Sequence, residues 1–350
     1  MNPQWRDFLT ARGATASASD TVDFPESGAG DPNRHIGCVL FDLSHLGLIA
    51  VRGVEAEQFL QGQLTNDIRE LSATHTQLSS HCSPKGRMLA SFRAMRLGDA
   101  ICLQLPRERV ADTLKRLRMF VLRAKVTLDD ASDDLVRIGV AGDRAPAGLE
   151  ALGLEIPRLD GDMAVTNGVN VLRLPSPAPR FELIGAVAPL TAAWDALAAH
   201  AAHGTPDDWA LHDIRSGIPT VYAETADLFV PQMANMQLVD GLSFTKGCYA
   251  GQEVVARMQY LGKLKRRMYL AEVEADSRPR PGDELHAPAS TSEQVNGRVV
   301  DARPLGDGRY ALLAVVEIDA AQSGEVRLGE TGPRLRLAPP PYGFPADADT

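Results

Sequence analysis

The stretch KGCYAGQEVVARM, residues 246–258, is a dense set of reactive and polar residues between two apolar stretches. Cys248 follows a lysine and a glycine, and a tyrosine, a second glycine, a Gln-Glu pair and an arginine come after it. The apolar spacing from the Gln-Glu pair onward predicts a helix with Val254, Met258 and Leu261 on one face. Cys248 then lies just before a helix N-terminus, where free N–H groups favour an anion such as a thiolate.

A structural interpretation explains the same stretch. Free cysteine is commonly buried and inert, and Gly247 and Gly251 allow either a sharp turn or the close approach of a ligand. Gln252 and Glu253 are suited to binding a ligand or to holding the turn. These residue types alone leave both interpretations of Cys248 open. The three other cysteines lie in or beside apolar strands and are predicted to be inert core residues: Cys38, Cys82 and Cys102.

Chain length, net charge and cysteine content indicate the general class of protein. A chain of 350 residues predicts two or three domains. The net charge of −9 argues against a surface that coats nucleic acid, although a local basic patch is compatible with it. Four cysteines without a CxxC pair favour neither a zinc ribbon nor a disulfide scaffold, so no metal site is predicted. The cysteine usage, and the lack of a signal-like or membrane-spanning apolar run, predict a cytoplasmic protein without a membrane partner.

The pattern of elements predicts an α+β organisation in several parts. Strand, proline and amphipathic helix follow one another in AICLQLP-RERVADTLKRLR (100–118) and again in RFELIGAVA-PLTAAWDALAA (180–199). This indicates a pseudo-repeat of two α+β units. Short strands separated by turn signals predict a small antiparallel barrel near the C-terminus. The expected parts are a flexible lead-in at 1–34, a region at 35–265 that holds the two units (about 35–130 and 131–205), and the barrel at 266–340.

Two basic runs stand out, residues 107–125 and 257–267. A solvated surface is the favoured interpretation. An anion site, for the anionic tail of a small ligand or an RNA phosphate, is the alternative. Few aromatic residues accompany the first run, which weakens the case for single-stranded RNA.

The central stretch resembles the signature K-G-C-Y-x-G-Q-E of the YgfZ-type folate-binding proteins, relatives of the glycine-cleavage T-protein (aminomethyltransferase). Further similar segments lie at 59–68, 81–88, 209–219, 229–237 and 338–344, so the resemblance covers nearly everything after about residue 35. The signature residues matched here are Lys246, Gly247, Cys248, Tyr249, Gly251, Gln252 and Glu253, and the match continues through Arg257.

The resemblance implies a GcvT-like three-lobed fold, in which two α+β lobes and a C-terminal antiparallel β-barrel surround a folate cavity. It implies tetrahydrofolate as the ligand. It also implies a role in making or maintaining iron–sulfur enzymes, including those that thiolate tRNA, so that iron–sulfur client enzymes are the expected partners. Direct nucleic-acid binding is not favoured.

Four site residues carry over from the resemblance. Cys248 matches the functional thiol, which is expected to face the folate cavity. Trp209 matches a tryptophan that contacts folate, and an indole is suited to pterin stacking. Leu46 lies where the family has a second such tryptophan, so that stacking contact is missing or replaced here. Glu224 lies where T-proteins place a pterin-binding glutamate.

The T-protein's catalytic aspartate pair corresponds here to Ala90 and Ser91, neither of which is a carboxylate base. The favoured function is therefore a folate-binding accessory protein for iron–sulfur enzymes. A one-carbon transferase of T-protein type and an RNA-binding module are the alternatives. The residues do not decide whether Cys248 binds a cluster iron with other ligands, relays sulfur or protects a thiol.

Overall fold

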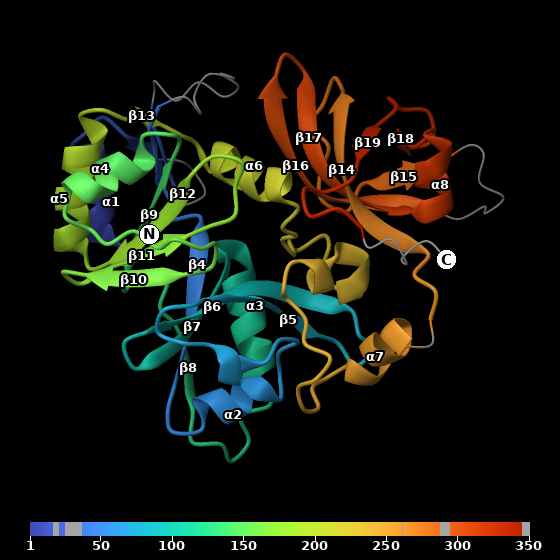
Figure 1. Cartoon of the computed structure of the whole chain (residues 1–350), viewed down its shortest axis with the longest axis horizontal. Coiled ribbons are helices and arrows are strands. Elements are labelled where there is room, and N and C mark those ends of the chain that lie inside the picture. The colour runs from blue at the N-terminus through green and yellow to red at the C-terminus, as the bar shows by residue number, and fades with distance from the viewer. Residues whose placement is uncertain (17–20, 25–36, 261, 288–294, 345–350) are drawn as a thin grey trace.

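The computed structural model describes residues 1–16, 21–24, 37–260, 262–287 and 295–344. Three large sheets organise the described chain, two in the N-terminal two thirds and one near the C-terminus (Figure 1). Helices and strands are mixed throughout, and the predicted α+β class is confirmed.

The first sheet is antiparallel, with strand order β5-β6-β7-β4-β8. Its helix α3 packs through Val110, Leu114 and Leu117, which are the apolar positions at helical spacing in the sequence. The elements of this sheet and its helices are β4 (Leu46–Arg52), α2 (Ala56–Gln61), η2 (Ile68–Glu70), β5 (Gln77–Cys82), β6 (Met88–Leu97), β7 (Ala100–Pro106), α3 (Arg107–Arg118) and β8 (Thr127–Asp130).

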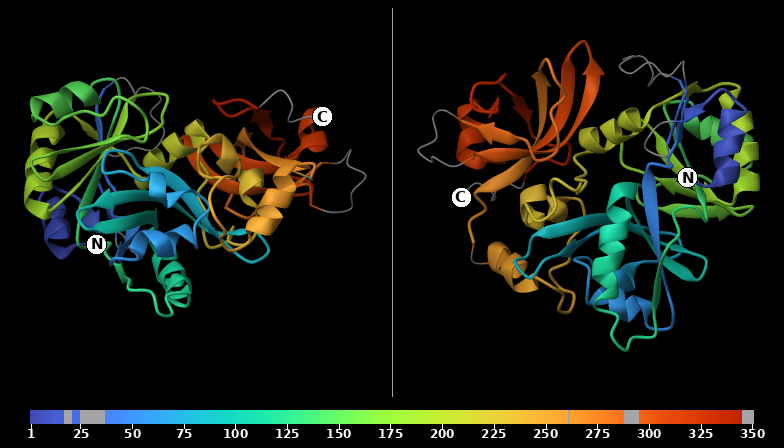
Figure 2. Two further views of the ribbon diagram at one scale, coloured as in Figure 1. Left: turned by 60° about the horizontal axis from the view of Figure 1, so that its bottom comes forward. Right: turned by 180° about the vertical axis from the view of Figure 1, so that it is seen from behind.

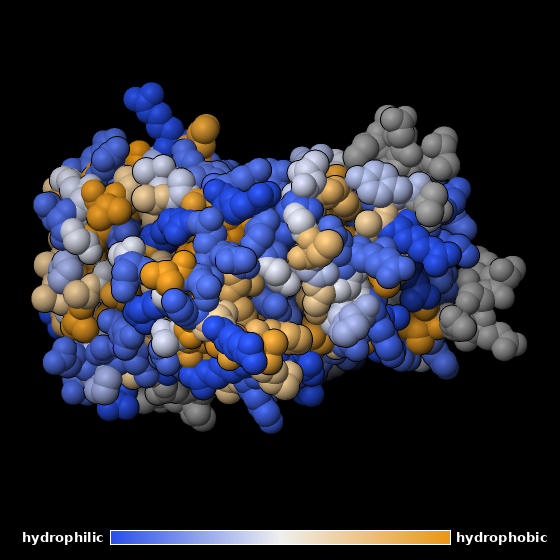
Figure 3. Space-filling view, turned by 90° about the horizontal axis from the view of Figure 1, so that it is seen from below, coloured by the Kyte–Doolittle hydropathy of each residue, from blue (hydrophilic) through white to orange (hydrophobic). Residues whose placement is uncertain are grey.

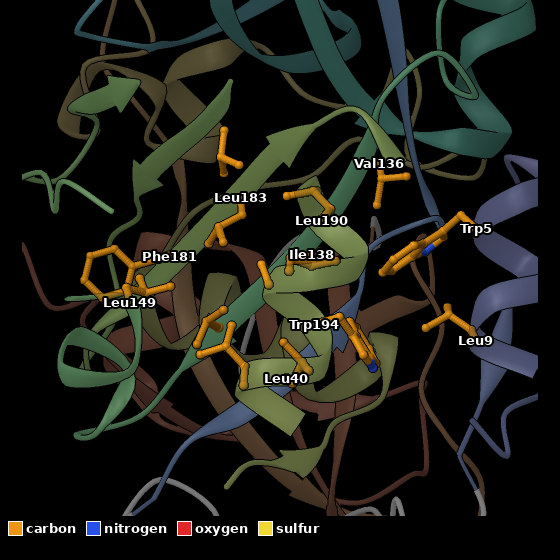
Figure 4. Close-up of a cluster of buried hydrophobic side chains, with 14 of the residues drawn as sticks. Trp5, Leu9, Leu40, Val136, Ile138, Leu149, Phe181, Leu183, Leu190 and Trp194 are labelled. Carbon is orange, nitrogen blue, oxygen red and sulfur yellow. The ribbon is translucent and has the colours of Figure 1, made fainter. Parts of the chain in front are cut away.

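The second sheet has the order β10-β11-β12-β9-β3-β13, and only its β3–β13 pair is parallel. Helices α1, α4 and α5 cover its core, in which Trp194 of α5 and Leu183 of β12 are buried (Figure 4). The bounds are α1 (Pro3–Thr10), β3 (Val39–Asp42), β9 (Val136–Ala141), α4 (Ala145–Ala151), β10 (Met163–Thr166), β11 (Val169–Arg173), β12 (Arg180–Gly185), α5 (Val187–Ala198) and β13 (Ala202–His203).

The prediction of a flexible lead-in is wrong for the first residues. Helix α1 places Trp5 and Leu9 in the second core, where they are 1% and 0% exposed (Figure 4). The indole nitrogen of Trp5 donates to Asp42 Oδ1 at 2.9 Å. A short hairpin follows, β1 (Thr15–Ala16) with β2 (Val22–Asp23). Residues 17–20 and 25–34 of the predicted lead-in lie outside the described residues.

The predicted boundary between the two α+β units also needs correction. Strand β3 lies inside the expected first unit, but it pairs with β9 of the second sheet, Val39 opposite Ala141. The chain therefore begins in the second unit and crosses to the first at β4. A strand's sequence indicates that a strand forms, whereas its partner depends on distant residues.

The C-terminal sheet is antiparallel in its main pairs and has the order β18-β15-β16-β17-β14-β19. Register shifts in β16, between Val299 and Asp301 and between Pro304 and Gly306, bend it. The sheet curls into a half-barrel, in keeping with the expected small antiparallel barrel, and an isolated bridge between Arg327 and Arg334 joins β18 to the segment just before β19. Its elements are β14 (Arg266–Glu274), β15 (Glu284–His286), β16 (Gly297–Gly306), β17 (Arg309–Glu317), α8 (Ile318–Ser323), β18 (Arg327–Leu328) and β19 (Arg336–Ala338).

Helix α6 (Pro206–Ser216) lies between the second sheet and the C-terminal sheet (Figures 1 and 2). Thr205 and Asp208 form a capping box at its start. Asp207 accepts from Arg278 at 2.7 and 2.9 Å and from Arg303 at 2.7 Å, so ion pairs join α6 to the C-terminal sheet. The chain then passes through η3 (Pro231–Ala234) and η4 (Met236–Leu238) to α7 (Gln252–Tyr260).

Candidate functional site

A small cavity of about 90 Å³ is lined by residues of both α+β sheets and of α6. Trp209, for which the resemblance implies contact with folate, and Leu46, which lies where the family has a second tryptophan, both line it. Ser91 lines it as well, and its hydroxyl accepts from the backbone N–H of Val221 at 3.0 Å. Ala90 lies in the core of the first sheet. The cavity therefore brings together three residues that are far apart in the sequence.

Trp209 is both a core residue and a lining residue. It is 2% exposed, and a side chain at Gly139 would come within 2.5 Å of its ring, so the glycine is required for this packing. The guanidinium of Arg180 lies over the indole, 3.8 Å from the ring centroid. One indole face is thus occupied by Arg180, where pterin stacking had been expected.

Buried charges surround the small cavity. The side-chain amide of Gln104 donates to both carboxylate oxygens of Glu182, at 3.0 and 3.1 Å. Arg180 is paired with Asp213 at 2.6 Å. Burial raises the pKa of Glu182, and the arginines nearby oppose that rise. Sequence analysis missed these residues, although charged residues inside otherwise apolar strands were a signal that the strands have polar partners.

A larger cavity of about 1030 Å³ adjoins the small one and shares Leu78, Arg93 and Ile218 with it. Residues from the first sheet, from loops beside the second sheet, from α6 and from the C-terminal tail contribute to its lining. Its volume is at the upper end of those that hold a cofactor-sized ligand. The lining also includes the residues just before the signature: Ser243, Phe244 and Thr245.

The signature lysine holds the wall of the larger cavity. Lys246 is 4% exposed, and its ammonium group donates to the backbone carbonyls of Leu64 at 2.5 Å and Asn66 at 2.8 Å. Asn66 lines the cavity. The signature and the segment at 59–68, which the resemblance noted separately, are therefore tied together by one buried side chain.

The buried Lys246 predicts a pH-dependent contribution to stability. Burial lowers the pKa of Lys246 to about 8 from an ordinary 10.5, so the unfolded chain binds more protons between these values. Stability from this residue therefore rises with pH across that window and is constant below it. We expect wild type to gain on the order of 1 to 2 kcal/mol relative to Lys246→Met between pH 7.5 and pH 10. Urea unfolding at several pH values measures this, and a difference that stays constant with pH would contradict it.

The other signature residues separate into buried and exposed groups. Tyr249 is buried, and burial raises its pKa well above the ordinary value. Gly251 has φ +81°, and a side chain there would come within 2.4 Å of the Ser83 carbonyl oxygen. Gln252 begins α7 and is half-buried. The exposed members are Gly247, Cys248, Glu253 and Arg257.

Cys248 does not lie where it was expected. Its side chain is exposed, and it is absent from the linings of both cavities. Helix α7 starts at Gln252, four residues further on, so the thiol does not lie directly at the helix N-terminus. The signature therefore builds a cavity wall on one side and presents a cysteine to solvent on the other.

Glu224 is exposed and lies against Gly282 of the C-terminal part. A Cβ added to Gly282 would come within 3.3 Å of Glu224. It lines neither cavity. Its role as a pterin ligand stays a prediction.

The basic runs are partly neutralised. In the first run, Arg107 pairs with Asp133, and Arg109 pairs with Asp112 and is buried. In the second run, Arg267 is buried. Hydrophobic residues are scattered among hydrophilic ones on the face viewed in Figure 3, which looks from below Figure 1. These contacts favour the interpretation of structural and solvated charges.

Comparison with known proteins first defines the fold. The sequence model of the GCVT N-terminal domain matches residues 34–159. The structure of the glycine cleavage system aminomethyltransferase T from Bartonella henselae matches with a TM-score of 0.75 over 98% of both chains, at 16% identity. At this identity the likeness concerns the fold, and the predicted GcvT-like class is confirmed.

The sequence relatives are more specific. The tRNA-modifying protein YgfZ of Sodalis glossinidius (strain morsitans) is 33% identical over 89% of this chain and 95% of its own length. The protein of the same name from Enterobacter sp. (strain 638) is 32% identical over 87% of this chain and 93% of its own. The chain belongs to the YgfZ family. In the described part of the chain, no helix has the length and apolar content needed to cross a membrane.

Proposed function

We propose that this protein binds tetrahydrofolate and supports the assembly or repair of iron–sulfur enzymes, including those that thiolate tRNA. The observation that carries the proposal is the shared cavity of Leu46 and Trp209, which adjoins a second cavity large enough for the rest of a folate. The iron–sulfur clients and a cytoplasmic location follow from the resemblance and belong to the proposal. Relatives named tRNA-modifying proteins support the link to tRNA.

The thiol and the ligand have separate places in this proposal. Because Cys248 is exposed and outside both cavity linings, it is suited to act on a protein client at the surface. Folate in the larger cavity then contacts and stabilises the cavity wall that Lys246 holds in place. Ser243, Phe244 and Thr245 belong to this wall. The same segment therefore serves both functions, but through different residues.

A T-protein-type transferase is less well supported. Ser91 has a hydroxyl in place of a carboxylate and already accepts a backbone hydrogen bond, and Ala90 lies in a core away from the cavity. The lining of the small cavity does contain the carboxylates of Glu182 and Asp213, but both are paired.

The test is a calorimetric titration of tetrahydrofolate into wild type, Trp209→Phe and Cys248→Ala. We expect wild type to bind, and Trp209→Phe to bind more weakly by about 1 kcal/mol, or roughly fivefold. Cys248→Ala is expected to bind like wild type but to leave iron–sulfur enzyme activity low in cells that lack the wild-type protein. Absence of binding by wild type would remove the folate role. Full restoration of activity by Cys248→Ala would remove the role of the thiol.

A further inference from the structure

An exposed apolar patch lies at the connection between α3 and β8, outside both cavities. Four of the eight large hydrophobic side chains that are exposed in the described chain gather here and form what we call the tip patch: Val54, Met119, Phe120 and Leu122, which are 87%, 60%, 45% and 89% exposed. Val54 belongs to it because its turn packs on the same connection, where a Cβ on Gly53 would stand 2.2 Å from the Lys125 carbonyl oxygen. Single exposed apolar residues are ordinary on a surface, whereas a group of them is typical of an interaction site.

Leu122 is the member of the tip patch that folding explains least. Its φ is +44°, in the left-handed region that residues other than glycine, asparagine and aspartate rarely adopt. Its side chain is almost fully exposed and gains no burial in the chain alone. A polar residue would suit both this backbone and the solvent better. A partner that covers Leu122 supplies the burial that the fold does not, and backbone strain of this kind is found at binding sites.

Basic residues flank the tip patch. Residues 115–125 contain five cations and no acidic residue, in a chain whose net charge is −9. Among the described residues, the ion pair in this stretch is that of Arg118 with Asp129, at 3.5 Å. The other four cations are exposed and form the basic flank: Lys115, Arg116, Arg123 and Lys125. An acidic surface with apolar residues therefore complements the tip patch in both charge and hydrophobicity.

A series of contacts connects the tip patch to the signature. The Phe120 ring meets the His81 ring edge-on, with centroids 6.2 Å apart. His81 Nδ1 donates to the carbonyl of Gln63 at 3.2 Å, and the carbonyl of the next residue accepts from Lys246. The connection after α3 and the loop before α7, which carries the exposed Cys248, both lie toward the lower edge of the molecule in Figure 1 and in the rear view of Figure 2. A partner on the tip patch is thus held on the same side of the molecule as this loop.

We propose that the tip patch and its basic flank dock an iron–sulfur client enzyme through an acidic and apolar face of the client, and hold it where Cys248 can act on it. This rests on the proposed function, to which it adds the place of the protein contact. RNA suits the patch less well, because only Phe120 offers a ring on which a base could stack. An anionic membrane would match the charge and the apolar side chains, but it gives no reason for the link to the signature.

The experiment measures docking of the full chain to the cluster-free form of an iron–sulfur enzyme that thiolates tRNA, by biolayer interferometry. Leu122→Asn and Phe120→Ala are each expected to weaken docking about tenfold, since each removes a large apolar side chain from the interface. Leu122→Asn is also expected to fold at least as stably as wild type, because asparagine tolerates a positive φ. The matched control is Leu159→Asn, the same change at a leucine between α4 and β10 that is 68% exposed, which is expected to dock like wild type.

A second pair of changes tests the charge of the client's face. The double variant Arg116→Glu with Arg123→Glu is expected to weaken docking about tenfold at low salt and to lose most of the difference between low and high salt. Docking by this variant that equals that of wild type at every salt concentration would overturn the acidic nature of the face.

The outcomes separate this proposal from the proposed function. Iron–sulfur enzyme activity in cells that lack the wild-type protein is measured for the same variants, and tetrahydrofolate binding is expected to be unchanged in all of them. Docking and activity of Leu122→Asn equal to wild type overturn the docking surface while the function stands. Docking that Leu122→Asn weakens, in cells whose enzyme activity does not depend on the protein, overturns the function and leaves the docking surface.

Other occupants of the tip patch are tested with the same variant. Wild type is titrated with tRNA and with phosphatidylglycerol vesicles, and sedimentation measures its association with a second copy. A wild type that does not dock to the client enzyme overturns the proposal. Binding to tRNA, to vesicles or to a second copy that Leu122→Asn abolishes, while docking to the enzyme is unchanged, overturns it as well.

Discussion

Replacing Trp5 by alanine is expected to lower the unfolding free energy by about 3 to 5 kcal/mol, as for other buried tryptophans and phenylalanines. The Trp5 ring stacks on Phe8 at 5.1 Å and meets Trp194 edge-on at 5.4 Å. Among the described residues, its indole N–H and the hydroxyl of Ser44 are the side-chain donors to the buried Asp42. The variant therefore opens a cavity in the second core and removes a hydrogen bond from a buried carboxylate.

Urea unfolding followed by far-ultraviolet circular dichroism measures this change without relying on tryptophan fluorescence. The matched control is Phe120→Ala, an aromatic residue just after α3 that is 45% exposed, which is expected to change stability by less than about 1 kcal/mol. Equal unfolding midpoints for Trp5→Ala and wild type would show that α1 is a peripheral lead-in after all.

Local elements of the fold could be predicted from the sequence because their causes are local. The turn at Asn167-Gly168 has positive φ at both residues, 52° and 78°, as an Asn-Gly hairpin turn requires. Gly98 has φ +61° between β6 and β7, a conformation that glycine adopts readily. Helix α3 buries the face that its spacing defined. Each of these depends on residues within one or two turns of chain.

Strand partners and docking could not be predicted in the same way. The four residues of β3 resemble any buried strand, and nothing in them selects β9 as a partner rather than β4. Helix α1 shows three apolar residues, which fit an isolated turn as well as a docked helix. Its place became clear only through Trp194 and Asp42, which lie far along the chain.

The same distinction between local and long-range causes applies to the candidate site. The signature located the important segment, but the resemblance implied a thiol that faces the folate cavity, and the thiol is exposed. The buried polar residues at the cavity lie in strands whose other residues are mostly apolar, so the sequence does not show which partners these polar residues have. A charge inside a sheet is tolerated only with a partner, and Gln104, the partner of Glu182, belongs to another sheet. Such pairs become visible only when the sheets are placed together.

Gly251→Ala is expected to lower the unfolding free energy by about 2 to 4 kcal/mol, since positive φ and a steric clash act together. With φ at +81°, a Cβ would stand 2.4 Å from the Ser83 carbonyl oxygen and 2.8 Å from the Gly86 Cα. Both neighbours are backbone atoms of the turn between β5 and β6, which cannot rotate away as a long side chain can. The signature must then separate from this turn. Helix α7 is expected to move together with the signature. Its position depends on the buried side chain of Val255 and on the hydrogen bond that the Gln232 side-chain amide in η3 donates to the Val255 carbonyl at 2.6 Å.

Gly247→Ala is the matched control, because no atom lies within 4 Å of a Cβ built there and its φ is not in the left-handed region. It is expected to change stability by less than about 0.5 kcal/mol. Urea unfolding compares the two variants, and hydrogen exchange of α7 distinguishes local detachment from global loss. Equal effects of the two variants would mean that the close approach at Gly251 is not what fixes the segment. A large effect confined to Gly251→Ala, beside an unchanged stability of Cys248→Ala, assigns the glycine to the position of α7 and leaves the cysteine free for chemistry at the surface.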